Sequence, residues 1–120
     1  MLPKDLSGAL RTVLNILDAW KVAPQDRLAL LGCDQETYDR WIRTRQLGEI
    51  PSGTLERLSY VLGIWKALKT LFPDPLVADT WVHRPNSAPE FNGSTPLAIM
   101  LRGQIEDLSL VRNFLDAWCG

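Results

Sequence analysis

The chain has little of what most catalytic and metal sites require. Its 120 residues include one histidine and two cysteines, Cys33 and Cys119, so a Cys/His zinc site cannot be assembled. His83 accompanies no nucleophile motif, and the sequence contains no glycine-rich phosphate-binding loop. We therefore expect no metal, no other cofactor and no enzymatic activity.

Long apolar runs and export signals are also missing. The longest uninterrupted apolar run extends only from Leu97 to Leu101, whereas a helix that crosses a bilayer needs about 20 such residues. Residues 1–5 lack the basic and apolar regions of a signal peptide, and a content of two cysteines suits a reducing compartment. These features predict a cytoplasmic protein that does not contact a membrane.

The net charge is close to zero and therefore does not indicate the kind of partner. The sequence has 13 Lys and Arg against 14 Asp and Glu. Residues 1–72 hold 10 basic and 8 acidic side chains, whereas residues 73–120 hold 3 and 6. An anion-binding surface is therefore expected in the first part.

What is present throughout is helical periodicity, and no segment alternates as a strand does. Leu10, Val13, Leu17 and Trp20 recur at steps of three and four, which places them on one helical face. Further helices are expected to begin at prolines or at capping residues and to end at glycines. Their expected ranges are 24–31, 35–46, 54–72, 75–81, 96–102 and a last helix that carries Ile105, Leu108, Val111, Leu115 and Trp118 on one face.

Residues 24–46 are typical of a helix-turn-helix, with Gly32-Cys33-Asp34 as the turn. At about 100° per residue, Tyr38, Trp41 and Ile42 fall on the side to be hidden. The opposite side carries Arg40 and Arg43, whose guanidinium groups suit guanine edges and phosphates. The candidate DNA-binding residues are Gln35, Glu36, Thr37, Arg40, Arg43 and Arg45.

A plainer interpretation is that these arginines are solvated surface charges. Glu36 and Asp39 dilute the positive face, and Leu28 stands where such motifs usually have a small residue. DNA binding by this segment can therefore be weak or require a dimer.

Residues 83–95 form a polar loop that is longer than a connection requires, which favours a presented surface. Trp81 precedes it and is expected to complete the core. An ordered string of motifs runs through this region: Trp81, then Pro85-Asn86, then Phe91-x-Gly93, then Pro96-Leu97, then a short helix that ends at Gly103, then the last helix.

This string resembles the toxin-binding domain of Xre/MbcA/ParS-type antitoxins, the partners of RES-domain toxins, over residues 55–118. With the helix-turn-helix before it, the resemblance implies an all-α fold in which an N-terminal Xre-like bundle packs against a C-terminal toxin-binding region. The expected parts are residues 1–72 and 73–120, or one compact unit. Trp81, Pro85, Gly93, Pro96 and Gly103 are then the structural residues of the motif.

The resemblance also implies how the chain acts. It would neutralise a cognate RES-domain toxin, an enzyme that degrades NAD⁺, by covering its active site. It would repress its own operon as a homodimer or in a larger toxin–antitoxin assembly on operator DNA. The residues that it assigns to the toxin are His83, Arg84, Asn86, Phe91, Asn92, Leu97, Met100, Arg112, Trp118 and Gly120.

Two aromatic residues carry specific expectations. Phe91 is expected to serve the partner and to add little to the core. Trp118, a bulky side chain two residues from the end of the sequence, is either a binding hot spot or packs on the first or fourth helix. Trp118 and Gly120 match the family by position and not by motif.

Two other functions remain open at this point. A stand-alone repressor of the phage type would bind its operator strongly and would have no use for the loop 83–95. An enzyme would need a pocket in which titratable groups converge, and the sequence offers one histidine and no nucleophile motif.

Overall fold

The computed structural model of the protein describes residues 6–120, so the expectation about a signal peptide in residues 1–5 lies outside the described part. Within residues 6–120 the chain forms helices and no strand, as an all-α fold requires. The elements are α1 (Leu6–Ala19), α2 (Pro24–Leu31), α3 (Gln35–Thr44), α4 (Thr54–Leu71), α5 (Pro75–Thr80), the 3₁₀ turn η1 (Trp81–His83), α6 (Pro96–Met100) and α7 (Ile105–Cys119).

The helices begin where the local sequence predicts. The side chains of Asp34, Asp74 and Thr95 accept hydrogen bonds from backbone N–H groups in the first turns of α3, α5 and α6. Gly32 ends α2 with a φ of 68°, a conformation that costs glycine little. The predicted third helix is two residues too long, because Arg45 adopts a φ of 58° and ends it at Thr44.

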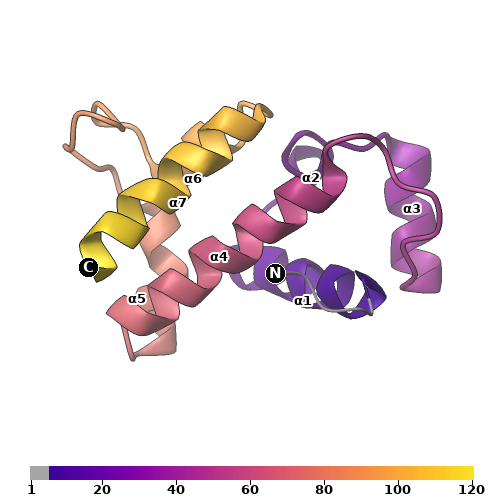
Figure 1. The fold of residues 1–120 in the computed structure, drawn as a ribbon, viewed down its shortest axis with the longest axis horizontal. Coiled ribbons are helices and arrows are strands. Elements are labelled where there is room, and N and C mark those ends of the chain that lie inside the picture. Colours follow the sequence, from indigo (N-terminus) through magenta and orange to yellow (C-terminus); the bar gives the residue numbers. More distant parts are fainter. Residues whose placement is uncertain (1–5) are drawn as a thin grey trace.

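The long helix α4 crosses the middle of the molecule and contacts α1, α2, α5 and α7 (Figure 1). The sequence predicts one apolar stripe on this helix, formed by Leu55, Leu58, Leu62, Trp65, Leu68 and Phe72, and the side chains that are buried form a different set. The buried side chains cover one broad face, about half of the helix circumference at about 100° per residue, because both α1 and α7 pack against α4. They are Thr54, Leu58, Val61, Ile64, Ala67 and Leu68.

One hydrophobic core runs through both halves of the chain, from Leu10 in α1 to Leu115 in α7. Within the first half, α4 is joined to α2 by Arg57, whose Nη1 donates to the Ala29 carbonyl at 2.9 Å. The second half meets the first at Gly103, which has a φ of +88° and lies close to α2. A Cβ added to Gly103 would be 3.3 Å from the Cβ of Ala29. The turn before α7 is therefore seated directly on α2.

A buried arginine fixes the N-terminal helices to one another. Arg27 Nε donates to the Val22 carbonyl, Nη1 to the Tyr38 hydroxyl and Nη2 to the Asp18 carboxylate. This one side chain thereby connects the end of α1, the turn that follows it, α2 and α3. Arg27 is therefore one of the basic residues counted in residues 1–72, but it is buried and is not part of the surface.

No helix among residues 6–120 combines the length and apolar character that crossing a membrane would demand.

Candidate functional site

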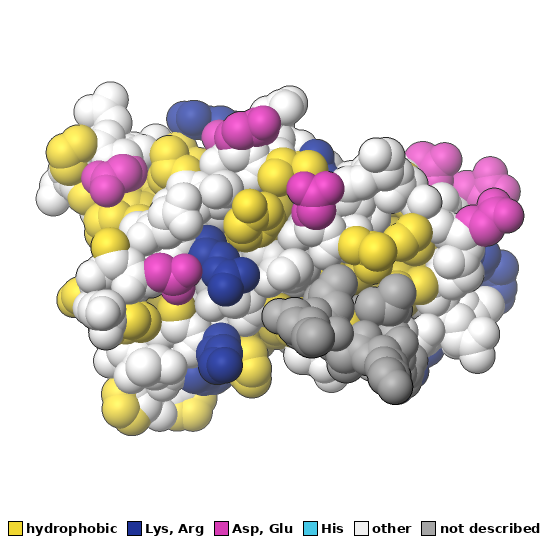
Figure 2. Space-filling model, in the orientation of Figure 1, with side chains coloured by type: hydrophobic (Ala, Val, Ile, Leu, Met, Phe, Trp, Pro, Cys, Tyr) yellow, Lys and Arg dark blue, Asp and Glu magenta, His cyan; other side chains and the backbone are white. Residues whose placement is uncertain are grey.

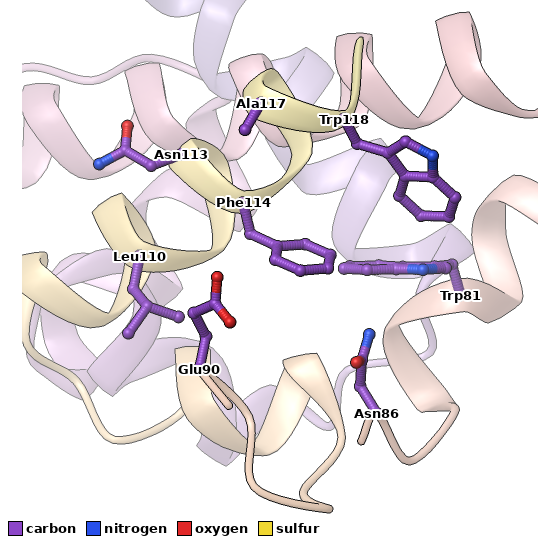
Figure 3. Close-up of a pocket in the computed structure, with 8 residues that line it drawn as sticks. All are labelled: Trp81, Asn86, Glu90, Leu110, Asn113, Phe114, Ala117 and Trp118. Carbon is purple, nitrogen blue, oxygen red and sulfur yellow. The ribbon is translucent and has the colours of Figure 1, made fainter. Parts of the chain in front are cut away.

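An open groove of about 780 Å³ lies between the loop that follows η1 and the C-terminal half of α7 (Figure 3). Its floor is mostly apolar, and three polar side chains stand at its rim. The lining residues are Trp81, Asn86, Glu90, Leu110, Asn113, Phe114, Ala117 and Trp118.

Aromatic rings in mutual contact form the floor of the groove. Phe114 is stacked with Trp81 at 6.3 Å between ring centroids and meets Phe91 edge to face at 4.9 Å. Trp118 meets Phe114 at 6.3 Å and Phe72, at the end of α4, at 5.7 Å, both edge to face. Such pairs stabilise one another beyond their simple burial, so the floor is held in shape before any partner arrives.

Trp118 packs beside the fourth helix, as one of its two interpretations required, and remains partly exposed. It packs against Phe72 beside the fourth helix, and 53% of its surface stays exposed. Exposed aromatic side chains with fixed neighbours are typical of binding hot spots. Hydrophobic side chains gather over this end of the molecule, whereas the end formed by α3 carries acidic and basic groups together (Figure 2).

The loop over the groove is held by its own backbone. Asn86 N donates to the Ser94 carbonyl at 3.1 Å, and Gly93 N donates to the Asn86 carbonyl at 2.8 Å. The Asn86 side chain stabilises the turn of the backbone, since its Oδ1 accepts a hydrogen bond from Ala88 N. The loop therefore presents an ordered surface.

Three polar side chains of the rim keep unused hydrogen-bonding capacity. Asn86 Nδ2 donates to no acceptor within residues 6–120, and Asn113 uses its own Nδ2 on the Ser109 hydroxyl, which leaves its Oδ1 open. Glu90 forms no salt bridge with any residue of the described chain. One donor and two acceptors are thus available beside the apolar floor.

The expectation that Phe91 adds little to the core was wrong. Its side chain is 1% exposed and lies beneath the groove, in contact with Trp81 and Phe114. Leu97 and Met100 are buried as well, because the short helix α6 turns its apolar side to η1 and α7. These three side chains belong to the hydrophobic core and do not line the groove.

Other residues assigned to the toxin lie away from the groove. His83 Nε2 is within hydrogen-bonding distance of the Trp20 carbonyl, and Arg84 Nη2 donates to the Thr80 hydroxyl at 3.3 Å. Asn92 is exposed in the loop with a φ of 49°, and Gly120 follows the end of α7. None of these four side chains or backbone positions lines the groove.

Arg112 points to the opposite side of α7. Its Nη1 donates to the Ser59 carbonyl at 3.5 Å, and its Nε lies 3.4 Å from Asp116. A Cβ added to Gly63 would come within 2.4 Å of the guanidinium, so the glycine makes room for it. Arg112 therefore joins α7 to α4.

Three of the residues predicted to be structural in the motif, Trp81, Gly93 and Pro96, are distinguished by burial or by backbone conformation. Trp81 is buried, as the core interpretation required, and Pro96 is buried at the start of α6. Gly93 has a φ of +87° with open space around it, so backbone conformation alone favours glycine there. Pro85 is exposed in the loop.

Sequence reasoning missed five residues of the groove: Glu90, Leu110, Asn113, Phe114 and Ala117. A pattern that could have found most of them is present. Positions 110, 113, 114, 117 and 118 follow the i, i+3, i+4, i+7, i+8 spacing of a second face on the last helix, next to the face that enters the core.

The surface of α3 differs from the expected basic reading face. Arg40 Nη2 donates to the carbonyls of Leu47 and Glu49 at 3.0 and 2.7 Å, so this guanidinium supports the loop after α3. Gln35 Nε2 donates to the Asp39 carboxylate. Ile42, expected to be hidden, is 39% exposed.

Of the remaining candidate DNA-binding residues, Glu36, Arg43 and Arg45 are exposed, and the Thr37 amide is taken up by the helix cap. A shallow hollow on this face is lined by Gln35, Glu36, Asp39, Arg40 and Arg43, so acidic and basic groups alternate across it.

Two pKa values shift at the turn between α2 and α3. Hydrogen bonds from Thr37 hold the pKa of the Asp34 carboxyl below its ordinary value, and the charge of Arg40 adds to this effect. Burial raises the pKa of the Cys33 thiol to about 11, and the negative charge of Asp34 contributes. Cys33 is therefore an uncharged thiol at neutral pH, which makes it a poor nucleophile.

Comparison with known proteins gives a family match in the C-terminal half and one relative that is similar over most of the chain. Residues 67–120 match the family described as the antitoxin Xre/MbcA/ParS C-terminal toxin-binding domain. The chain is also 39% identical over 112 residues to the uncharacterized protein y4oB of Sinorhizobium fredii (strain NBRC 101917 / NGR234). That similarity covers 92% of this chain and 84% of the relative, and all residues that line the groove fall within 67–120.

Proposed function

Since the chain belongs to the Xre/MbcA/ParS antitoxin family, with its toxin-binding domain in residues 67–120, we propose that it neutralises a RES-domain toxin through the groove described above. The observation that carries this proposal is the position of the groove. Its aromatic floor lies entirely inside the toxin-binding domain, and Trp118 stays exposed at its edge.

Neutralisation is stoichiometric in this proposal. The antitoxin covers the active site of an enzyme that degrades NAD⁺ and performs no chemistry itself, so it needs no cofactor. The preformed floor favours tight binding, because the loop and α7 lose little freedom when the complex forms. Trp118 and Phe114 supply the apolar contact, and the polar rim sets the orientation of the bound segment.

Co-expression with the protein encoded by the neighbouring reading frame tests this function. Wild-type antitoxin restores growth, whereas Trp118→Ala restores it poorly although soluble protein accumulates. Truncation of a hot-spot aromatic typically costs about 2 kcal/mol, or about 30-fold in affinity. Ile42→Ala, which removes an exposed apolar side chain from the distant helix α3, is the matched control and rescues fully.

Full rescue by Trp118→Ala would remove the groove from the toxin interface. A neighbouring reading frame without toxicity, together with strong operator binding by the isolated chain, would favour the stand-alone repressor instead.

We propose autorepression as a second function, carried by α2, the turn and α3 in a dimer or a toxin–antitoxin assembly. The supporting observation is that Arg43 and Arg45 remain exposed at the end of α3. Because acidic side chains share this surface, we expect modest operator affinity for the free antitoxin. Arg43→Ala should lower the slope of log affinity against log salt by about 0.9 if it contacts one phosphate. A slope and an affinity equal to the wild-type values would exclude Arg43 from the DNA interface.

A further inference from the structure

We propose that the groove is selective for a toxin segment that combines an apolar side chain with a lysine or arginine, and that Glu90 accepts the cation. The inference rests on the toxin-binding function proposed above, and it deepens that function by assigning the chemistry of the segment that is bound.

The first observation is the isolation of the Glu90 carboxylate. Glu90 lines the groove between apolar side chains, and its carboxylate is turned toward α7 (Figure 3). Arg84, the cation nearest in sequence, donates to the Thr80 hydroxyl and forms no salt bridge with Glu90 in the described chain. The next cations pair with other carboxylates: Lys69 with Asp79, Arg102 with Asp107 and Arg112 with Asp116. Glu90 is therefore a carboxylate beside an apolar floor without a cation of its own.

The second observation is the charge around the groove. Residues 73–120, which include every residue that lines the groove, hold 3 basic and 6 acidic side chains, and Glu90 is the one charged residue of that lining. The last turn of α7 reaches the groove through Ala117 and Trp118 and contains no basic residue. The carbonyl groups at the end of a helix carry partial negative charge, so this end adds to the field of Glu90. A cation bound in the groove is therefore stabilised by the Glu90 carboxylate and by the C-terminal end of α7.

The third observation is the set of open hydrogen-bonding groups. Asn86 offers a donor, because its Oδ1 is already used, and Asn113 offers an acceptor. These two amides stand on opposite walls, in the loop and in α7, and both line the groove. They suit the C=O and N–H groups of a peptide segment whose apolar side chain rests on Phe114 and Trp118.

The geometry thus separates two tasks. The aromatic floor supplies affinity for any apolar segment, whereas Glu90 decides which segment is accepted. An open ion pair of this kind contributes modestly to affinity and more to association rate and to discrimination between partners. A second copy of this chain is the rival occupant, and the experiment below distinguishes it.

The test measures the affinity of the full-length chain for the toxin from the neighbouring reading frame, at low and at high salt. Glu90→Gln keeps the size of the side chain and should weaken binding about fivefold at low salt and hardly at high salt. Glu90→Lys should weaken it about 50-fold or more, because like charges then meet. Glu49→Gln, which neutralises an exposed carboxylate in the loop after α3, is the matched control and should leave the affinity unchanged.

Rescue by charge exchange gives the decisive outcome. Single Lys→Glu or Arg→Glu changes on the toxin surface are screened against Glu90→Lys, and one of them should restore most of the affinity. Wild-type affinity for both Glu90 variants at every salt concentration would overturn the inference, while weak binding by Trp118→Ala would leave the proposed function standing. A change in the oligomeric state of free Glu90→Lys, seen by light scattering with toxin affinity intact, would assign the groove to a second copy and would also overturn it.

Discussion

The groove and the surface of α3 are both expected to bind partners, and they treat their functional groups in opposite ways. In the groove the backbone of the loop is held by its own hydrogen bonds, and each polar side chain of the rim keeps some unused hydrogen-bonding capacity. On α3 two of the candidate side chains are used within the chain: Arg40 on two carbonyls and Gln35 on Asp39. The other charged candidates, Glu36, Arg43 and Arg45, are exposed. The groove places its open polar groups beside a fixed apolar floor, whereas α3 presents exposed charges of both signs without such a floor.

The largest expected effect concerns the floor of the groove. Phe91→Ala removes a side chain that is 1% exposed and supports Trp81 and Phe114, so it should lower the free energy of unfolding by about 3–5 kcal/mol. Chemical denaturation measures this loss. Glu90→Ala, one residue earlier and exposed, should change it by less than about 0.5 kcal/mol. If Phe91→Ala unfolds like the wild type yet loses the toxin, the floor is independent of the core.

The next effect concerns the arginine beneath α3. Arg27→Ala leaves the Tyr38 hydroxyl and the Val22 carbonyl without their buried partner and should cost about 2–4 kcal/mol of stability. Asp18→Asn should cost less than about 1 kcal/mol, since Asp18 is exposed and an exposed charge contributes little. Equal losses for both variants would show that the ion pair, and not the buried hydrogen bonds, holds these helices together.

A smaller effect distinguishes the two arginines of α3. Arg40→Ala removes hydrogen bonds to the Leu47 and Glu49 carbonyls and should lower stability by about 1 kcal/mol. Arg43→Ala should leave the melting temperature unchanged, because the Arg43 side chain is exposed on α3. The opposite order of melting temperatures would mean that Arg40 is a free surface charge and that the contrast between α3 and the groove is wrong.

The smallest effect is the pH dependence of the cap at Asp34. The pKa of Asp34 is lowered in the folded chain, so folding favours its charged form. Its contribution is therefore complete above the ordinary aspartate pKa of about 4 and is lost as the pH falls through the lower folded value. Asp34→Ala should lower the melting temperature at pH 7, and the difference should shrink on acidification. Asp34→Asn keeps an acceptor for the cap, and its melting temperature should depend less on pH than that of the wild type. If the difference in melting temperature between the wild type and Asp34→Ala grew on acidification, the pKa of Asp34 would be raised in the folded chain and not lowered.

Local signals in the sequence were sufficient for most helix boundaries. Asp34, Thr95 and Gly32 act through their own backbone neighbourhood, so a cap or a left-handed turn can be predicted from residue type alone. The order of motifs from Trp81 to Gly103 likewise indicated the antitoxin family, to which residues 67–120 belong. The order of the motifs indicates the family, but it does not show which of these side chains are exposed.

The exposure of individual side chains followed from packing between distant segments. Phe91 sits in a polar loop and still becomes buried, because α7 brings Phe114 against it across more than 20 positions of sequence. Arg112 has the charge of a surface residue, yet Gly63 of α4 opens a place for it between two helices. Sequence spacing assigns a residue to a face of its own helix, but only the neighbouring helix decides whether that face is covered.

The sequence by itself therefore determined the helices, their caps and the family of the C-terminal half, since these depend on local chemistry and on ordered motifs. Only the tertiary structure decided that Glu90, Asn86 and Trp118 share one groove, because they come from a loop and from a helix that meet through the core. It also decided that Arg40 is bound to the chain itself, since the loop carrying Leu47 and Glu49 folds back onto α3. Whether a polar group is free for a partner depends on every other group within reach of it, and that is a property of the folded chain.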